Sequence, residues 1–437
     1  MYIRSFFICS LLLLSCGLSH AQQELSLYFL QEAMPARMQN PAFMTEKKIQ
    51  IGLPSPFVSA QHDGFAWKNL IRPMAGTDSF LVDPDYALMN MKDRNRLQAH
   101  AAMDLLGFSI RLGGLQLSLN TATRSQVSFT YPKDLLEITW HGNAPFMGEN
   151  LDLAPGIQAY AYHEIGLGAA FRIKDKLSLG IRPKYLIGLA SFSTQRQQLS
   201  LQTNPETYAL GLDLDYSLRT SMVQLGSLED LENLQPSFEP QPFTSNRGWA
   251  IDLGMDWKVL EKLRVSASVR DLGFLNWNEQ TTTYRASGQL SFEGFDAARM
   301  LSDSQAIESF KDSMLQQIQL DEESSAGFRT VLPGTASVSL IFSPIKSFRV
   351  GGLYQATWYD GKTASALALN ASKDLGKVFT AGLTYAIQNR SYTNLGLNLW
   401  LKLGPFAGFI ASDNVLAPLL PRSSRQVNLR IGSQILF

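Results

Sequence analysis

The last eleven residues of the chain alternate between apolar and polar side chains, and this alternation restricts the fold more than any other feature. The odd-numbered positions are apolar, except for Ser433: they are Val427, Leu429, Ile431, Ile435 and Phe437. The other parity consists of Gln426, Asn428, Arg430, Gly432 and Gln434. Side chains alternate faces along a β-strand, so the segment has one apolar and one polar face, and its length suits a tilted transmembrane strand. The alternative is a half-buried strand at the end of a soluble β-sandwich.

The N-terminus has the pattern of a secretory signal peptide. Arg4 is the only charge before an apolar run over residues 6–14, and small residues stand one and three positions before Gln22. Because these features define a signal and its cleavage site, we expect residues 1–21 to be removed. Residues 13–16 also resemble a lipobox, so a lipoprotein signal with a lipid anchor is the alternative.

Composition excludes several classes of protein. Both cysteines, Cys9 and Cys16, lie in the expected signal, so the mature chain has no disulfide and no thiolate metal ligand. The 38 basic and 38 acidic residues cancel, whereas a nucleic-acid-binding surface needs a basic surplus. Beyond the signal, no apolar run reaches the roughly 18 residues of a membrane helix. A membrane-embedded form of this chain therefore has to be a closed barrel, which satisfies every backbone polar group in lipid.

Period-two alternation recurs through the rest of the chain. The clearest segments are 177–185, 208–218, 249–257, 263–270, 379–385 and 395–403. Many of their apolar faces carry Trp or Tyr near an end, as the aromatic girdles of membrane barrels do. Strands of soluble sandwiches are usually about five or six residues long, which is shorter than these segments. We therefore predict an all-β fold, a transmembrane antiparallel outer-membrane β-barrel of about fourteen strands over residues 96–437.

Residues 22–95 lack this alternation, because prolines such as Pro35, Pro41, Pro54 and Pro56 interrupt it. The segment is nevertheless rich in large apolar residues: Phe43, Phe57, Phe65, Trp67, Leu70, Ile71 and Phe80. A solvated linker would be polar and poor in aromatic residues. We expect residues 22–95 to form an N-terminal extension that plugs the lumen. An irregular segment packed elsewhere on the protein is the alternative.

Charged residues on the polar parity of the predicted strands are expected to face the lumen. They are Arg182, Lys184, Asp213, Asp215, Asp252, Asp256, Arg264, Arg270 and Arg430. Because buried charges need partners, we expect these groups to form ion pairs with one another. A narrow lumen filled in this way is stable without conducting anything.

Motifs for catalysis and for cofactor or metal binding are absent from the sequence. It has no Gly-x-Ser-x-Gly elbow, no His-Glu-x-x-His, no phosphate-binding glycine loop and no paired histidines with metal-ligand spacing. After the signal, the histidines are scattered: His62, His100, His141 and His163. We expect no enzymatic activity, no catalytic residues, no cofactor and no metal.

Several short motifs resemble those of a known family. Asn40-Pro41-Ala42 is similar to the N-terminal motif of fatty-acid-channel-like barrels. Further motifs occur at 132–136, 140–143, 184–188, 251–254 and 270–274 with Trp277. Their order and spacing resemble an uncharacterised Bacteroidota outer-membrane β-barrel family, a domain of unknown function related to fatty-acid-channel-like and type IX secretion accessory barrels. The resemblance covers essentially the whole mature chain.

The resemblance implies a fold and a location, the outer membrane of a Gram-negative bacterium, but no activity. The C-terminal Phe437 resembles the assembly signal of outer-membrane barrels, which implies outer-membrane lipids and the barrel-assembly machinery as partners. One expected function is a channel for small hydrophobic or amphipathic molecules, with apolar groups lining a path near the plug. The alternative is a non-transporting accessory barrel that docks a secretion or surface partner, with a lumen filled by ion pairs and with long ordered loops.

Overall fold

The computed structural model describes most of the 437-residue chain. The described residues are 24–64, 70–73, 80–225, 237–238, 241, 244–292, 317–359, 361–388, 391–418 and 424–437. The expected signal peptide with both cysteines lies outside them, as do Phe65 and Trp67. Within the described ranges, no helix has the length and apolar character that a membrane-crossing helix requires.

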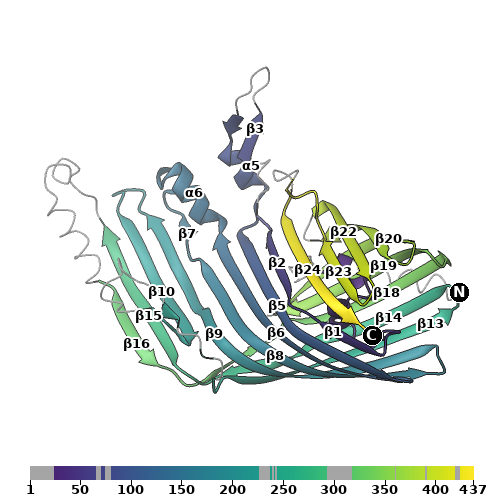
Figure 1. Cartoon of the computed structure of the whole chain (residues 1–437). Coiled ribbons are helices and arrows are strands. Elements are labelled where there is room, and N and C mark those ends of the chain that lie inside the picture. The colour runs from purple at the N-terminus through teal and green to yellow at the C-terminus, as the bar shows by residue number, and fades with distance from the viewer. Residues whose placement is uncertain are drawn as a thin grey trace, which may run out of the picture.

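The strands close into an antiparallel barrel with 14 wall positions (Figure 1). One position is shared by β1 (Ile49–Gly52) and β2 (Ser55–His62). The others, in order around the wall, are β5 (Arg94–Leu112), β6 (Leu115–Pro132), β8 (Gly156–Ile173), β9 (Leu177–Thr203), β13 (Arg247–Leu260), β14 (Leu263–Trp277), β18 (Gly334–Ile345), β19 (Phe348–Tyr359), β20 (Lys362–Leu375), β21 (Phe379–Gln388), β22 (Ser391–Leu403), β23 (Phe406–Ser412) and β24 (Gln426–Leu436). The predicted all-β barrel and its strand count are confirmed.

The barrel closes through its N-terminal strands. β24 pairs with β23 on one side and with β1 and β2 on the other, and these two strands pair in turn with β5. Residues 49–62, predicted above to belong to the N-terminal extension, therefore lie in the wall. The reason is local: Leu53 and Pro54 split this wall position into pieces of 4 and 8 residues, so neither piece shows a long alternation.

The two faces of the C-terminal strand match its sequence pattern. Leu429 and Ile431 are 38% and 47% exposed on the outer face, and Phe437 at the end of the chain is 61% exposed. Arg430 and Gln434 face inward, with exposures of 2% and 1%. The outer wall is thus apolar and the inner wall polar, as the period of two requires.

The two ends of the barrel differ in their connections. Turns of two or three residues join β5 to β6, β8 to β9, β13 to β14, β18 to β19, β20 to β21, and β22 to β23, and we call this the short-turn end. Phe437 lies here, because its backbone N–H donates to the Ile49 carbonyl at 2.9 Å. The opposite, long-loop end carries the connections 63–93, 133–155 and 413–425.

At the long-loop end the sheet branches. β13 pairs with residues 177–187 of β9, whereas β10 (Leu210–Ser221) pairs with residues 191–203. On its other side β10 pairs with β15 (Thr281–Phe292), and β15 pairs with β16 (Gln319–Ser324). These strands form the flared edge at the left of Figure 1. We call β10, β15 and β16 the branch sheet. β17 (Phe328–Val331) returns to pair with β14.

Short elements decorate the long-loop end. They are β3 (Ile71–Pro73), β4 (Phe80–Val82), α5 (Pro84–Met89), α6 (Lys133–His141), η2 (Ala144–Phe146), β7 (Asn150–Asp152), β11 (Val223–Gln224) and β12 (Ser237–Phe238). In Figure 1, β3, α5 and α6 stand above the wall.

Residues 24–48, the inner segment, run through the lumen before the chain enters β1. The segment contains α2 (Leu25–Tyr28) and α3 (Met34–Gln39), and every residue of both helices is buried. One face packs Leu25, Tyr28, Phe29 and Phe43 on inward residues such as Leu353. Another face packs residues of α2 and α3 on Trp400 and Phe409 of the wall. The core of the short-turn half of the barrel is therefore built by the chain's own N-terminal segment.

Candidate functional site

Asn40, Pro41 and Ala42 occupy a notch in the inner wall. The Asn40 side-chain amide donates to backbone carbonyls of β13 and β14 at 3.1 and 3.3 Å, and its oxygen accepts from the Ala42 N–H at 2.9 Å. Gly180 of β9 and Gly254 of β13 face each other in the ladder and form the floor of the notch. A Cβ atom on Gly180 would overlap the Pro41 backbone, and one on Gly254 would overlap the Asn40 side chain. The wall therefore has room for this turn only because both positions are glycine.

Side chains of the wall and of the connection after β23 also bind the backbone of the inner segment. The Asp413 carboxylate accepts from the N–H groups of Leu25 and Ser26 at 3.1 and 2.7 Å, which satisfies free donors at the start of α2. Gln434 accepts from the Met34 N–H at 2.8 Å. Gln116 accepts from the Thr45 N–H at 2.8 Å. Apart from Lys48, whose backbone bonds Arg111 and Phe437 beside β1, the inner segment is thus attached by single side-chain contacts rather than by a strand ladder.

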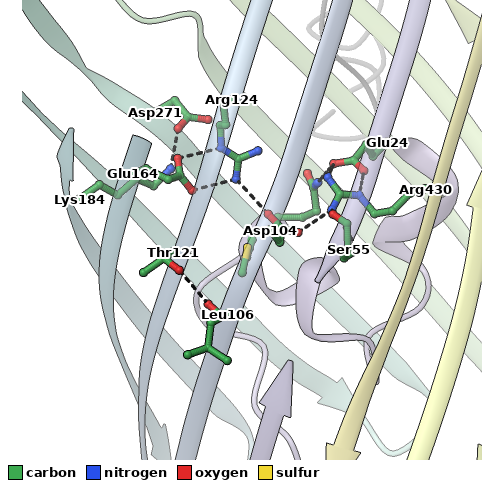
Figure 2. A network of polar contacts seen from close by, with 12 residues as sticks. Glu24, Ser55, Asp104, Leu106, Thr121, Arg124, Glu164, Lys184, Asp271 and Arg430 are labelled. Atoms are coloured by element: carbon green, nitrogen blue, oxygen red, sulfur yellow. Dashed lines mark hydrogen bonds and ion pairs between the residues drawn. The ribbon is translucent and has the colours of Figure 1, made fainter. Parts of the chain in front are cut away.

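Charged side chains cross the middle of the lumen in a connected group, which we call the charge belt. Its members are Glu24, Asp104, Arg124, Glu164, Arg182, Lys184, Asp252, Asp271 and Arg430. Figure 2 shows Arg124 between Glu164, at 2.8 Å, and Asp104, at 3.9 Å. Arg270 lies close enough to Asp271 to attract it electrostatically, so five basic and five acidic groups balance here.

The belt joins the inner segment to the wall at two places. Arg430 of β24 binds Glu24 of the inner segment and also Asp104 of β5, at 2.5 Å (Figure 2). Arg182 of β9 binds Asp252 and donates to the Met38 carbonyl of α3 at 2.6 Å. Removing one partner of such a buried pair leaves an uncompensated charge, which typically costs about 3–5 kcal/mol.

The structure places the predicted lumen charges in three groups. Four of them, Arg182, Lys184, Asp252 and Arg430, lie in the charge belt, and Arg270 is next to it. Asp256 and Arg264 are 3.7 Å apart nearer the short-turn end. Asp213 and Asp215 lie on β10 of the branch sheet, where they contact Gln198 and Arg196 at 2.6 and 2.9 Å. They take no part in the belt, because β10 is not one of the strands of the wall.

Other belt members were not identified from the sequence: Glu24, Asp104, Arg124, Glu164 and Asp271. By its odd position in β14, Asp271 would face the lipid. However, it has a φ of 60° and lies opposite Asp252, where the pairing of β13 and β14 shifts register. This β-bulge turns its carboxylate inward, where it binds Lys184 at 2.5 Å. A register shift also follows Asp104 on β5. The only available sequence signal for Asp271 was the 270–274 motif.

A cavity of about 650 Å³ opens at the short-turn end beneath α2, and we call it the vestibule. Its apolar lining comprises Phe29, Leu30, Leu260, Leu263, Ile341, Val378, Trp400 and Leu436. Seven basic side chains also line it: Lys47, Lys258, Lys262, Arg264, Arg349, Lys377 and Lys402. The four acidic ones are Glu32, Glu46, Glu261 and Asp374.

Most acidic groups of the vestibule are already paired. Lys258 binds Glu261 at 2.7 Å, and Arg349 binds Asp374 at 2.8 Å. Glu46, in the loop before β1, binds Arg111 and Arg172 at 2.6 and 3.1 Å. Partial burial raises the pKa of Glu46, but these two guanidinium groups outweigh it, so the pKa is lowered overall. The remaining lysines give the vestibule a positive surplus.

Side chains of the wall also occupy the lumen on the other side of the inner segment. An apolar cluster lies towards the long-loop end and consists of Tyr160, Tyr162, Leu186, Ala250, Leu275, Trp277 and Leu332. Cavities beside the charge belt and beside α3 measure only about 40 and 30 Å³. Within the described ranges, no group of three or more His, Cys, Asp and Glu residues is placed to hold a metal ion.

Comparison with known proteins identifies a family and several similar folds. The family model "Family of unknown function (DUF5723)" matches residues 41–413. No curated protein sequence matches the chain. Among solved structures, the Ralstonia pickettii toluene transporter TbuX is 11% identical with a TM-score of 0.45, and the alignment covers 93% of this chain and 94% of that one.

Two further structures are similar at the same level. The Pseudomonas putida toluene transporter TodX is 8% identical with a TM-score of 0.41, and the alignment covers 92% of each chain. A Pseudomonas aeruginosa FadL homologue is 11% identical with a TM-score of 0.41, over 92% of this chain and 94% of that one. At such identities and TM-scores the likeness carries no argument about function, which has to rest on the geometry of the lumen.

Proposed function

The chain belongs to the family of unknown function DUF5723, and we propose that it is an outer-membrane channel for small amphipathic molecules, closed at rest by its inner segment. The expected membership of a family of unknown function is confirmed, whereas the Bacteroidota origin and the relation to type IX secretion accessory barrels stay predictions. The outward apolar residues and the expected signal peptide support the outer membrane as its location. Lipids of that membrane and the barrel-assembly machinery are the proposed partners.

The vestibule is the observation that carries the proposal. Its volume of about 650 Å³ lies in the range of ligand pockets, about 300–1,000 Å³. Phe29 and Leu30 of the inner segment supply part of an apolar surface, which favours the hydrocarbon part of a ligand. Lys47 and Lys402 line the same cavity, and within the described residues no carboxylate pairs with either. The combination favours molecules with an apolar body and an anionic head.

The inner segment is suited to act as a hatch because the wall does not need it. All 14 wall positions are filled by residues 49–436, and the backbone bonds of Lys48 beside β1 are the last that join this stretch to its neighbours, so displacing residues 24–47 breaks no strand ladder. The segment plugs the short-turn half of the lumen and lies directly above the vestibule. A molecule crossing the barrel has to displace it. The contacts that oppose this are the ion pair of Glu24, the notch around Asn40, the side chains that accept from its backbone, and the apolar packing.

A non-transporting accessory barrel is the second candidate. The observation that favours it is the charge belt, which crosses the lumen with balanced ion pairs and leaves cavities of only about 40 and 30 Å³ nearby. The ordered helices α5 and α6 and the branch sheet would then be the surface that docks a secretion or surface partner. We expect no enzymatic activity from either candidate.

The experiment compares the mature chain with a form lacking residues 24–45, both reconstituted in liposomes. The truncated form keeps Glu46, which binds Arg111 and Arg172, and it keeps β1. We expect it to insert, to show heat-modifiable gel mobility, and to admit a dansyl-labelled amphipathic carboxylate much faster than the intact chain does. The double variant Lys47→Gln with Lys402→Gln in the intact chain should bind this probe more weakly.

The two candidates predict different results. A truncated barrel that inserts and stays sealed contradicts the hatch and favours the accessory barrel. Faster entry of a neutral sugar of similar size, with no preference for the amphipathic probe, would contradict the proposed ligand class while leaving the hatch intact.

A further inference from the structure

A second, much smaller cavity lies between α3 and the inner faces of β5, β6 and β8. Its volume is about 30 Å³, and it is lined by side chains from the inner segment and from the wall. The polar groups that line it are Arg37, Ser109, Gln116, Ser118, Asn120 and Arg182. It lies outside the vestibule and shares none of the vestibule's lining residues.

Arg37 is the most unusual of these groups. Its residue exposure is 6%, and neither of its terminal guanidinium nitrogens has a hydrogen-bond partner within the described part of the chain. No described carboxylate forms an ion pair with it. Glu32 attracts it from a distance, but this carboxylate belongs to an exposed residue. An isolated buried charge is strongly unfavourable, so the guanidinium requires a negative partner.

The neighbouring charge belt does not supply this partner. Arg182 lines the same cavity, but its guanidinium is engaged by Asp252 and by the Met38 carbonyl. With Arg270 beside Asp271, the five cations of the belt already balance its five carboxylates. Arg37 therefore adds a positive charge that the described lumen does not neutralise nearby.

The other polar atoms at the cavity are mainly donors. The Asn120 side-chain nitrogen and the Ser109 hydroxyl are buried and have no partner among the described residues. The Gln116 side-chain oxygen is occupied by the Thr45 N–H at 2.8 Å. Together, Arg37, Asn120 and Ser109 surround the cavity with unused donors and one uncompensated positive charge, which is the chemistry of an anion site.

We propose that this cavity binds a small monovalent inorganic anion, a halide such as chloride, coordinated by Arg37 of the inner segment together with Asn120 of β6 and Ser109 of β5. A water molecule needs a cavity volume of about 10–15 Å³. The cavity of about 30 Å³ therefore accepts one halide and at most one water. A phosphate or an organic carboxylate is too large. The ion ties α3 to two strands of the wall. The proposal does not depend on transport.

The test uses the full mature chain in detergent, and the readout is the temperature at which the unboiled gel mobility is lost. Sodium chloride or bromide is titrated against sodium gluconate at constant ionic strength. A ligand that binds only the folded state stabilises it by RT ln(1 + [L]/Kd), so the stability rises with the ligand concentration. We expect the midpoint to rise by several degrees with halide. No difference between the halides and gluconate overturns the proposal.

Two variants locate the effect. Arg37→Gln should lose the halide dependence, whereas Arg196→Gln, which removes the charge of an exposed guanidinium on β9, should retain it in full. Because Arg37→Gln risks misfolding, Asn120→Asp provides an independent test. It places a permanent carboxylate at the cavity, so this variant should be as stable in gluconate as the unaltered chain is in chloride. Halide dependence that persists unchanged in Asn120→Asp and Arg37→Gln overturns the proposal.

Crystals grown in sodium bromide give a direct observation. We expect a bromine anomalous peak between the Arg37 guanidinium and the Asn120 amide. Water alone at this position overturns the proposal, and so does a bromide peak without any halide dependence in solution, because that outcome shows binding at crystal concentration only.

Discussion

The wall and the inner segment of this barrel are stabilised by different kinds of interaction. In the wall, continuous antiparallel ladders join every strand to two neighbours, and apolar side chains such as Leu429 and Ile431 cover the outside. Before Lys48 the inner segment has no ladder. It is held by barrel side chains that accept from its backbone, by an ion pair of Glu24, and by close packing against glycines.

This difference has a consequence for function. A ladder is lost cooperatively, and in lipid its backbone groups have no other partners, so the wall is the permanent part of the molecule. The contacts of the inner segment are few, and each can be exchanged for water in a hydrated lumen. A segment held in this way is able to detach while the wall remains closed. The four predictions below test this distinction, beginning with the largest effect.

Arg430→Met is expected to have the largest effect, because it leaves Glu24 without its cation and leaves Asp104 with only Arg124, 3.9 Å away. The expected loss is about 3–5 kcal/mol in the free energy of unfolding, measured by urea titration of the folded barrel. Arg264→Met is the control: Arg264 is partly exposed and 3.7 Å from Asp256, so we expect a loss of no more than about 1 kcal/mol. Equal losses in the two variants would contradict the role of the charge belt.

Ile431→Arg tests the wall alone. A lipid-facing Arg near the membrane midplane costs about 2–4 kcal/mol in a barrel, so the yield of inserted protein should fall. Asn428→Arg on the inward parity of the same strand should be milder, because the new guanidinium faces the Asp413 carboxylate, which Asn428 now contacts at 2.7 Å. Similar damage from both changes would show that the assignment of the two faces is incorrect.

Gly254→Leu tests the inner segment alone. The new side chain overlaps Asn40 in the notch, and overpacking of this kind costs about 1–3 kcal/mol. We expect the inner segment to be displaced, so that residues 24–48 become sensitive to protease while gel mobility still reports a folded wall. Gly211→Leu on the branch sheet is the control, because a Cβ atom there meets nothing closer than 4.0 Å. If protease protection is equal in the two variants, the notch does not hold the segment.

The pH dependence of Glu46 is the smallest expected effect. Its pKa is lowered in the folded protein, chiefly because Arg111 and Arg172 outweigh its partial burial. A lowered folded pKa contributes stability above the unfolded value of about 4.3, and this stability is lost as the pH falls through the folded value. Its side chain is 71% exposed, so we expect less than about 1 kcal/mol. Glu46→Gln should remove this contribution when the free energy of unfolding is measured as a function of pH between neutral and acidic conditions.

Most strands of the wall could be predicted from local patterns in the sequence. Wherever a strand separates lipid from lumen, its apolar and polar side chains alternate with a period of two, and this pattern is local. The alternation over residues 427–437 therefore predicted both faces of the last strand. The same reasoning predicted the all-β class and a count of about fourteen strands. It also identified Arg182, Lys184, Asp252 and Arg430 as inward charges, because each lies on the polar parity of a regular strand.

The contents of the lumen depend on contacts between segments that are far apart in the chain. Asp271 joins the charge belt through a bulge that reverses its parity, and a bulge leaves no periodic signal. Residues 49–62 complete the wall although Pro54 breaks their pattern, because β5 and β24 offer them edges to pair with. Nothing in the sequence around Arg37 indicates a binding site, because the cavity forms only where α3 packs against β5 and β6. Contacts between segments so distant in the chain depend on closure of the barrel, and no local pattern encodes them.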